Sequence, residues 1–162
     1  MIAYPDTSFL CALYRRQDNS PAAAAHFADM KEPLHVSTLL LYEFRQGMRF
    51  QAWLHRQNPA KGFPQTHADQ ALADLQSDLD SGAVVLVAAQ WPDVLSRAEL
   101  LSRRHTKTGG HRGLDILHVA TALHLDATEL LTFDKNQRRL ARAAAARGIA
   151  QIDRNRRQQR QR

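Results

Sequence analysis

Apolar and polar positions divide the chain into two kinds of segment: short apolar runs and longer stretches with helical spacing. The apolar runs lie at residues 1–4, 34–36, 83–87 and 130–133. The run at 83–87 is continuously apolar, as is typical of a strand covered on both faces, whereas residues 34–36 alternate and are predicted to form a brief strand. At least one stretch with apolar residues at three- and four-residue intervals follows each run. This alternation predicts an α/β fold, a three-layer α/β/α sandwich with a mostly parallel central sheet.

Proline and glycine mark several of the expected boundaries. Pro5 has no backbone N–H to give to a neighbouring strand, so we expect the first strand to end there. The polar, glycine-bearing stretch 106–113 is predicted to be a loop. A last helix is expected over residues 136–147, ended by a glycine, and residues 149–152 are expected to add an edge strand.

Four carboxylates occupy positions that favour a site over a solvated surface. Asp115 lies in the first turn of an otherwise apolar helix, where Asp is a poor helix former and costly to bury. Asp6 and Asp134 each follow a predicted strand, and Glu43 lies inside the helix after the second strand. Because ligands bind at the carboxyl ends of parallel strands, we expect these four acids to converge at one end of the sheet.

A cluster of four carboxylates is stabilised by a bound cation, because the negative charges otherwise repel one another. Oxygen ligands without Cys or His at ligand spacing favour a hard ion, Mg²⁺ or Mn²⁺. We expect Asp6 and Asp115 to contact the metal directly. Glu43 and Asp134 would complete a second metal position or hold metal-bound water. Such ions activate water and stabilise the leaving oxygen when a phosphodiester is cleaved.

Each acid taken alone also has a structural interpretation. Asp6 precedes Thr and Ser and could be a helix N-cap, and Asp134 could cap the helix that follows it. Glu43 could be a solvated helix residue. Asp115 is the hardest of the four to explain in this way. His118, one turn from Asp115, is expected to satisfy a buried hydrogen bond rather than to bind metal.

Length and charge predict one domain with a basic tail. The chain has 162 residues, 44% of them hydrophobic, which suits a single domain over residues 1–152. Five arginines after Asp153 account for five of the six net positive charges. Residues 153–162 contain no apolar residue and cannot pack into a core. We therefore expect a disordered tail that either holds RNA loosely or is simply solvated.

Cysteine content and hydropathy bear on the compartment. Cys11 is the single cysteine, so an internal disulfide is excluded and a reducing, cytoplasmic location is expected. No apolar run approaches the ~20 residues of a membrane span, and the N-terminus does not resemble a signal peptide. We therefore expect no membrane partner.

Three motifs together with Glu43 resemble the PIN-domain family, most closely the VapC-type ribonuclease toxins of bacterial toxin–antitoxin pairs. The motifs lie at residues 6–10, 112–122 and 131–137, and the resemblance spans residues 1 to about 150. It implies a PIN fold, RNA cleavage that depends on Mg²⁺ or Mn²⁺, a cognate antitoxin and frequently a homodimer. The family's four acids map onto Asp6, Glu43, Asp115 and Asp134.

Two features depart from the family pattern, and a third bears on substrate binding. Pro5 stands where the family usually has an apolar strand residue, and the stretch 49–80 is longer than in compact members. A basic run over residues 103–112 leads into Asp115 and either holds RNA phosphates or is a solvated helix end. Arg112 is nearest the acids and is our candidate for substrate binding.

Three functions remain open from the sequence. The first is a metal-dependent endoribonuclease toxin of a type II toxin–antitoxin pair. The second is a housekeeping PIN nuclease without an antitoxin. The third is a non-catalytic RNA-binding or regulatory PIN-like domain, which would have no need of four acids.

Overall fold

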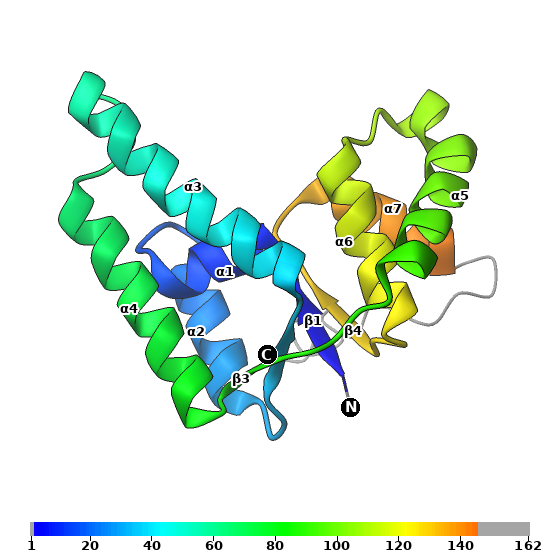
Figure 1. Ribbon diagram of the computed structural model, residues 1–162, viewed down its shortest axis with the longest axis horizontal. Coiled ribbons are helices and arrows are strands. Elements are labelled where there is room, and N and C mark those ends of the chain that lie inside the picture. The colour runs from blue at the N-terminus through cyan, green and yellow to red at the C-terminus, as the bar shows by residue number, and fades with distance from the viewer. Residues whose placement is uncertain (1, 146–162) are drawn as a thin grey trace, which may run out of the picture. The chain divides into compact units, whose positions relative to one another are not determined.

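Four short strands and seven helices make up the part of the chain that the structure describes (Figure 1). The structure is a computed structural model, and it describes residues 2–145. The chain divides into two compact units. The terminal unit joins the first six residues to the chain from Ala88 onward, and the central unit is Thr7–Val87.

The central unit holds two parallel strands and four helices. Its elements are α1 (Thr7–Tyr14), α2 (Ser20–Asp29), β2 (Leu34–Val36), α3 (Thr38–Gln57), α4 (Gln65–Ser81) and β3 (Val84–Leu86). β2 pairs with β3, with His35 opposite Val85. Ser37 caps α3 by accepting a hydrogen bond from the backbone N–H of Leu40 at 3.3 Å. α3 packs along α4, and Phe44 is fully buried in this core (Figure 1).

The terminal unit is built from the two ends of the sequence. Its elements are β1 (Ala3–Pro5), α5 (Trp91–Gly109), α6 (Gly113–His124), β4 (Glu129–Leu131) and α7 (Lys135–Ala145). β1 pairs in parallel with β4, with Tyr4 opposite Leu130. α6 buries most of its length, as its apolar sequence predicted, and it packs against α5 and α7.

The predicted α/β class and the parallel pairing are confirmed, and so is the end of the first strand at Pro5, whereas two other boundaries are corrected. One residue beyond β1, the N–H of Asp6 still donates to Leu131 O at 3.0 Å. Alternate N–H groups of a strand point to opposite neighbours, so the missing N–H of Pro5 does not interrupt this ladder. α5 continues through Gly109 and ends at Gly110 in the left-handed conformation, so the predicted 106–113 loop shrinks. β4 ends at Leu131, before the predicted end of that strand.

Some expectations lie outside the described residues. These are the end of the helix over 136–147, the edge strand at 149–152 and the tail 153–162. Within residues 2–145, no helix combines the length and the apolarity needed to cross a membrane.

Candidate functional site

Asp6 is a fully buried carboxylate at the exit of β1. Its exposed fraction is 0%, and the backbone places it immediately after the paired residue Pro5. The Thr132 Oγ1 donates a hydrogen bond to Asp6 Oδ2 at 2.5 Å. A buried carboxylate needs such donors, because burial without them costs several kcal/mol. Thr132 therefore fixes one oxygen of Asp6 in the terminal unit.

Asp134 lies just past β4 and begins α7. Its Oδ1 accepts hydrogen bonds from the backbone N–H groups of Asn136, at 2.6 Å, and Gln137, at 3.0 Å. Its own N–H donates to Thr132 Oγ1 at 2.9 Å. The capping interpretation of Asp134 is thus confirmed. Capping occupies Oδ1 of Asp134, so a ligand would bind through its Oδ2.

Asp115 lies in the first turn of α6, as predicted, and is half-buried. A negative charge there is favoured by the dipole of the helix. The side-chain amide of Gln137 donates to Asp115 Oδ1 at 3.4 Å. Gln137 is itself 4% exposed, and within the described residues its Oε1 has no hydrogen-bond partner. A buried amide oxygen of this kind lies beside Asp115 and can accept a hydrogen bond from a bound molecule.

A chain of hydrogen bonds therefore joins three of the four predicted acids inside the terminal unit. The Thr132 hydroxyl donates to Asp6 and accepts from the N–H of Asp134. The carboxylate of Asp134 accepts from the N–H of Gln137, and the side-chain amide of Gln137 donates to Asp115. β1 and β4 are parallel, so Asp6 and Asp134 follow strands that end at the same edge. We name this set the acid chain.

The sequence analysis missed Thr132 and Gln137. Each stands at a fixed distance from Asp134, two residues before it and three residues after it. An N-capping Asp bonds the N–H three residues later, so the position of Gln137 follows once Asp134 is recognised as a cap. Nothing comparable in the sequence pointed to Thr132, whose contact with Asp6 spans 126 residues.

Glu43, the fourth predicted acid, belongs to α3 of the central unit and is half-buried. Thr7 Oγ1 donates a short hydrogen bond to Glu43 Oε2. Glu43 is thus held by a neighbouring element, which disagrees with the interpretation of this residue as simply solvated. Thr7 directly follows Asp6 in the sequence.

The donor set of the acid chain is chemically suited to a hard divalent cation, because it consists of carboxylate and hydroxyl oxygens. Across residues 2–145, no group of three or more His, Cys, Asp or Glu side chains is arranged to hold a metal ion. Asp6 Oδ2 and Asp134 Oδ1 accept hydrogen bonds from donors of the protein itself. The roles of the four acids as ligands stay predictions.

Two histidines lie near this region. His118 is 1% exposed and its Nδ1 lies 3.5 Å from Tyr4 Oη, which agrees with the predicted buried polar contact. His111 is 8% exposed. Burial lowers the pKa of His111 below 6.5, Arg139 and His105 lower it further, and the charges of Asp115 and Asp134 oppose the change. A neutral imidazole is therefore favoured beside these acids.

Arg112, the candidate for substrate binding, is exposed at the N-cap position of α6, and its side chain makes no capping bond there. It lies three residues before Asp115. A guanidinium in this position is free to meet an anion in solvent, and its substrate contact stays a prediction.

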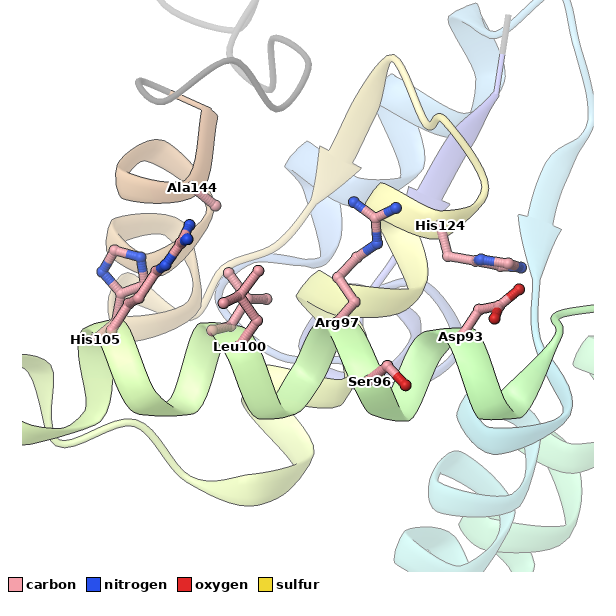
Figure 2. Close-up of a pocket in the computed structure, with 9 residues that line it drawn as sticks. Asp93, Ser96, Arg97, Leu100, His105, His124 and Ala144 are labelled. Carbon is pink, nitrogen blue, oxygen red and sulfur yellow. The ribbon is translucent and has the colours of Figure 1, made fainter.

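A separate pocket of about 480 Å³ lies among α5, α6 and α7 of the terminal unit. Figure 2 shows Arg97, Leu100 and His105 projecting from α5 into it, with His124 of α6 at one end and Ala144 of α7 at the other. None of the four predicted acids lines this pocket. It is therefore distinct from the acid chain.

The chain is similar to known proteins over nearly its whole length. The family model described as PIN domain matches residues 3–143. Among solved structures, VapC20 of Mycobacterium tuberculosis, described as a sarcin–ricin loop cleaving toxin, has 20% identity and a TM-score of 0.58 and covers 91% of this chain and 96% of its own. FitAcB of Neisseria gonorrhoeae has 16% identity and a TM-score of 0.57, and the match covers 94% of this chain and 97% of the FitAcB chain. No protein with a curated description matches.

Proposed function

The chain belongs to the PIN-domain family, and we propose on this basis that it is a metal-dependent endoribonuclease, the toxin of a type II toxin–antitoxin pair. The observation that carries the proposal is the acid chain. Three carboxylates predicted as catalytic are joined by hydrogen bonds at one edge of the β1–β4 pair. A purely structural role accounts for Asp134, which caps α7. Such a role does not account for Asp6, a fully buried carboxylate that is linked to Asp134 through Thr132.

The similar structures support the choice of substrate. One of them is described as a toxin that cleaves the sarcin–ricin loop, and this chain covers most of its length. RNA is therefore the substrate class that we assign to this chain. The sequence motifs in 6–10, 112–122 and 131–137 point to the same family of toxins.

In the proposed mechanism, Asp6 and Asp115 would hold a divalent ion, Mg²⁺ or Mn²⁺, and Glu43 and Asp134 would complete a second position or hold metal-bound water. When bound, such ions activate a water molecule and stabilise the charge of the leaving oxygen. The protein's own part is to hold the carboxylates in place. Thr132 orients Asp6, and Gln137 orients Asp115.

Arg112 is proposed to bind a phosphate of the RNA. It is exposed and lies at the start of the helix that carries Asp115. Backbone phosphates are commonly bound by Arg side chains and by the N-termini of helices, and such contacts position the substrate without reading its sequence.

The partners are proposed from the family resemblance. We propose that a cognate antitoxin binds near the acids, that the protein forms a homodimer and that it acts in the cytoplasm. Co-expression with the product of a neighbouring open reading frame, followed by co-purification and an RNA cleavage assay, tests the first of these. Failure of every neighbouring product to bind would favour a nuclease without an antitoxin.

The direct test is RNA cleavage by the purified chain in Mg²⁺, Mn²⁺ or EDTA, beside the Asp115→Asn variant. We expect cleavage that needs the metal and that falls about 100-fold or more in Asp115→Asn, since the carboxylate's contribution to metal-stabilised charge is worth several kcal/mol. Asp93→Asn is the matched control, because Asp93 also lies in the first turn of a helix but is exposed.

Two results would contradict the proposal. Full activity in Asp115→Asn would remove the assigned mechanism. RNA binding without cleavage by the folded wild-type chain, in either metal and with a range of RNAs, would instead support a non-catalytic RNA-binding domain.

A further inference from the structure

α3 exposes an aromatic face that its packing in the central unit does not explain. Tyr42 is 66% exposed, Phe50 48% and Trp53 46%. Within residues 2–145, these are the large aromatic side chains that are exposed. Their spacing of eight and three residues places them on one side of the helix. We call these three residues the α3 aromatic face.

Two of these side chains form a stacked pair. The ring centroids of Phe50 and Trp53 lie 5.7 Å apart with an angle of 20° between the ring planes. Each ring of the pair covers one face of the other, and the remaining exposed surface of both rings faces solvent. Single-stranded nucleic acids bind exposed aromatic surface of this kind, because every base can stack on an aromatic ring.

Arginines lie beside the α3 aromatic face. Arg49 and Arg56 are exposed, lie seven and fourteen residues after Tyr42, and so share its side of the helix. Neither has a carboxylate partner within the part of the chain that the structure describes. The acid of α3 is Glu43, which accepts a hydrogen bond from Thr7. Positive charge next to aromatic rings is complementary to a phosphate backbone with unstacked bases.

The length of the face suits a single strand of RNA. At these exposed fractions the three aromatic side chains offer roughly 300 Å², using about 150–250 Å² for each ring side chain. Three rings spread along about 16 Å of helix can stack with a few unpaired nucleotides.

We propose that the α3 aromatic face, with Arg49 and Arg56, binds single-stranded RNA and leads it along α3 toward Glu43. The proposal rests on the proposed function, because it assigns a substrate surface to the same helix that carries one of the four acids. Tyr42 directly precedes Glu43, so the face ends beside that residue in the sequence.

The test measures binding separately from cleavage. The full chain carrying Asp115→Asn is titrated into a fluorescent, unstructured RNA of about 12 nucleotides, and the dissociation constant is read from fluorescence anisotropy. In this background, Trp53→Ala and Phe50→Ala are each expected to weaken binding about 5- to 100-fold, and Trp53→Phe is expected to keep it. Leu95→Ala is the control, since Leu95 is 56% exposed on α5 and should leave binding unchanged.

Arg49→Gln tests the electrostatic part. It is expected to weaken binding to all RNA sequences alike and to reduce the slope of log affinity against log salt by about one. A second readout uses the Trp91→Phe variant, in which Trp53 is the remaining tryptophan. Its emission is expected to fall as RNA binds, because stacking brings a base against the indole.

Several outcomes would overturn the inference. These are equal affinities of Trp53→Ala and Leu95→Ala, a Trp53 emission unchanged by saturating RNA, and no RNA affinity of the parent at low salt. A change of molecular mass in light scattering, with no quenching of Trp53 by RNA, would assign the face to a second copy. If the wild-type chain cleaves RNA while the aromatic variants bind it normally, this inference fails and the proposed function stands.

Discussion

Replacing Thr132 by Val would test the acid chain at its centre. Val has nearly the same shape as Thr but cannot donate to Asp6 Oδ2 or accept from the N–H of Asp134, contacts of 2.5 and 2.9 Å. Asp6 is fully buried and cannot recover a lost donor from solvent without a local opening of the structure. The variant therefore removes two hydrogen bonds while keeping the packing.

The size of the effect can be worked from these contacts. A hydrogen bond to a charged group contributes about 1.5–3 kcal/mol, and the backbone contact adds about 1 kcal/mol. We expect Thr132→Val to lower the free energy of unfolding by about 2.5–4 kcal/mol. For a chain of this size that corresponds to a melting temperature lower by about 5–10 °C, or to a urea midpoint lower by about 1 M.

Urea unfolding followed by circular dichroism measures the stability, with Thr132→Ser as the control that keeps the hydroxyl. If Thr132 also orients Asp6, the variant should bind the metal more weakly, because loss of such a supporting contact lowers metal affinity about 10- to 100-fold. The Mg²⁺ concentration that half-saturates cleavage should therefore rise in Thr132→Val and not in Thr132→Ser. Equal stability and equal metal dependence of the two variants would refute the reasoning.

Two further predictions concern other parts of the fold. Gly109→Ala should cost about 1–3 kcal/mol in thermal unfolding, because its Cβ would lie 2.1 Å from His111 Nε2, whereas Gly113→Ala, with nothing within 4 Å, should be neutral or slightly stabilising. Burial and the hydrogen bond to Asp78 raise the pKa of Tyr14 in the folded protein above 10.0. As the pH rises, Tyr14 therefore loses its hydroxyl proton in the unfolded chain before it does so in the folded protein. The stabilising contribution of Tyr14 is then present below pH 10.0 and lost above it, and Tyr14→Phe should show a shallower loss of stability between about pH 9 and 11.

Much of the architecture could be predicted because apolar runs and helical spacing are local properties. Asp115 could be singled out because a lone acid in an apolar helix has few structural explanations. Asp134 at the start of α7 was foreseen as a cap, and its contacts with Asn136 and Gln137 bear this out. These inferences depend on neighbours within a few residues.

What the sequence analysis missed depends on distant contacts. The hydrogen bond from Thr132 to Asp6 joins residues that no local pattern relates. The first strand ends at Pro5 as expected, but the hydrogen bond from the N–H of Asp6 to Leu131 could not be foreseen, because it depends on the pairing with β4. α5 extends beyond His105 although Thr is a weak helix former, and such propensities are routinely overridden by tertiary packing.

The α3 aromatic face escaped the sequence analysis for a related reason. Tyr42, Phe50 and Trp53 stand in a helix whose apolar residues are spread over a wide side. The structure divides them: Phe44 and Met48 are buried, and the three others are exposed. A wide apolar stripe does not by itself distinguish a core-facing side from an interaction surface.

The pairing of β1 with β4 sets the time at which the acid chain can assemble during synthesis. Ala3 pairs with Glu129, and Asp6 meets Thr132, so the ribosome must have passed Thr132 before the first strand has its partner and Asp6 its donor. Contacts of such long sequence separation form late in folding. A nascent or truncated chain that stops before Glu129 holds Asp6 and Asp115 without the strand that aligns them. The acid chain therefore assembles only after Thr132 has joined the fold.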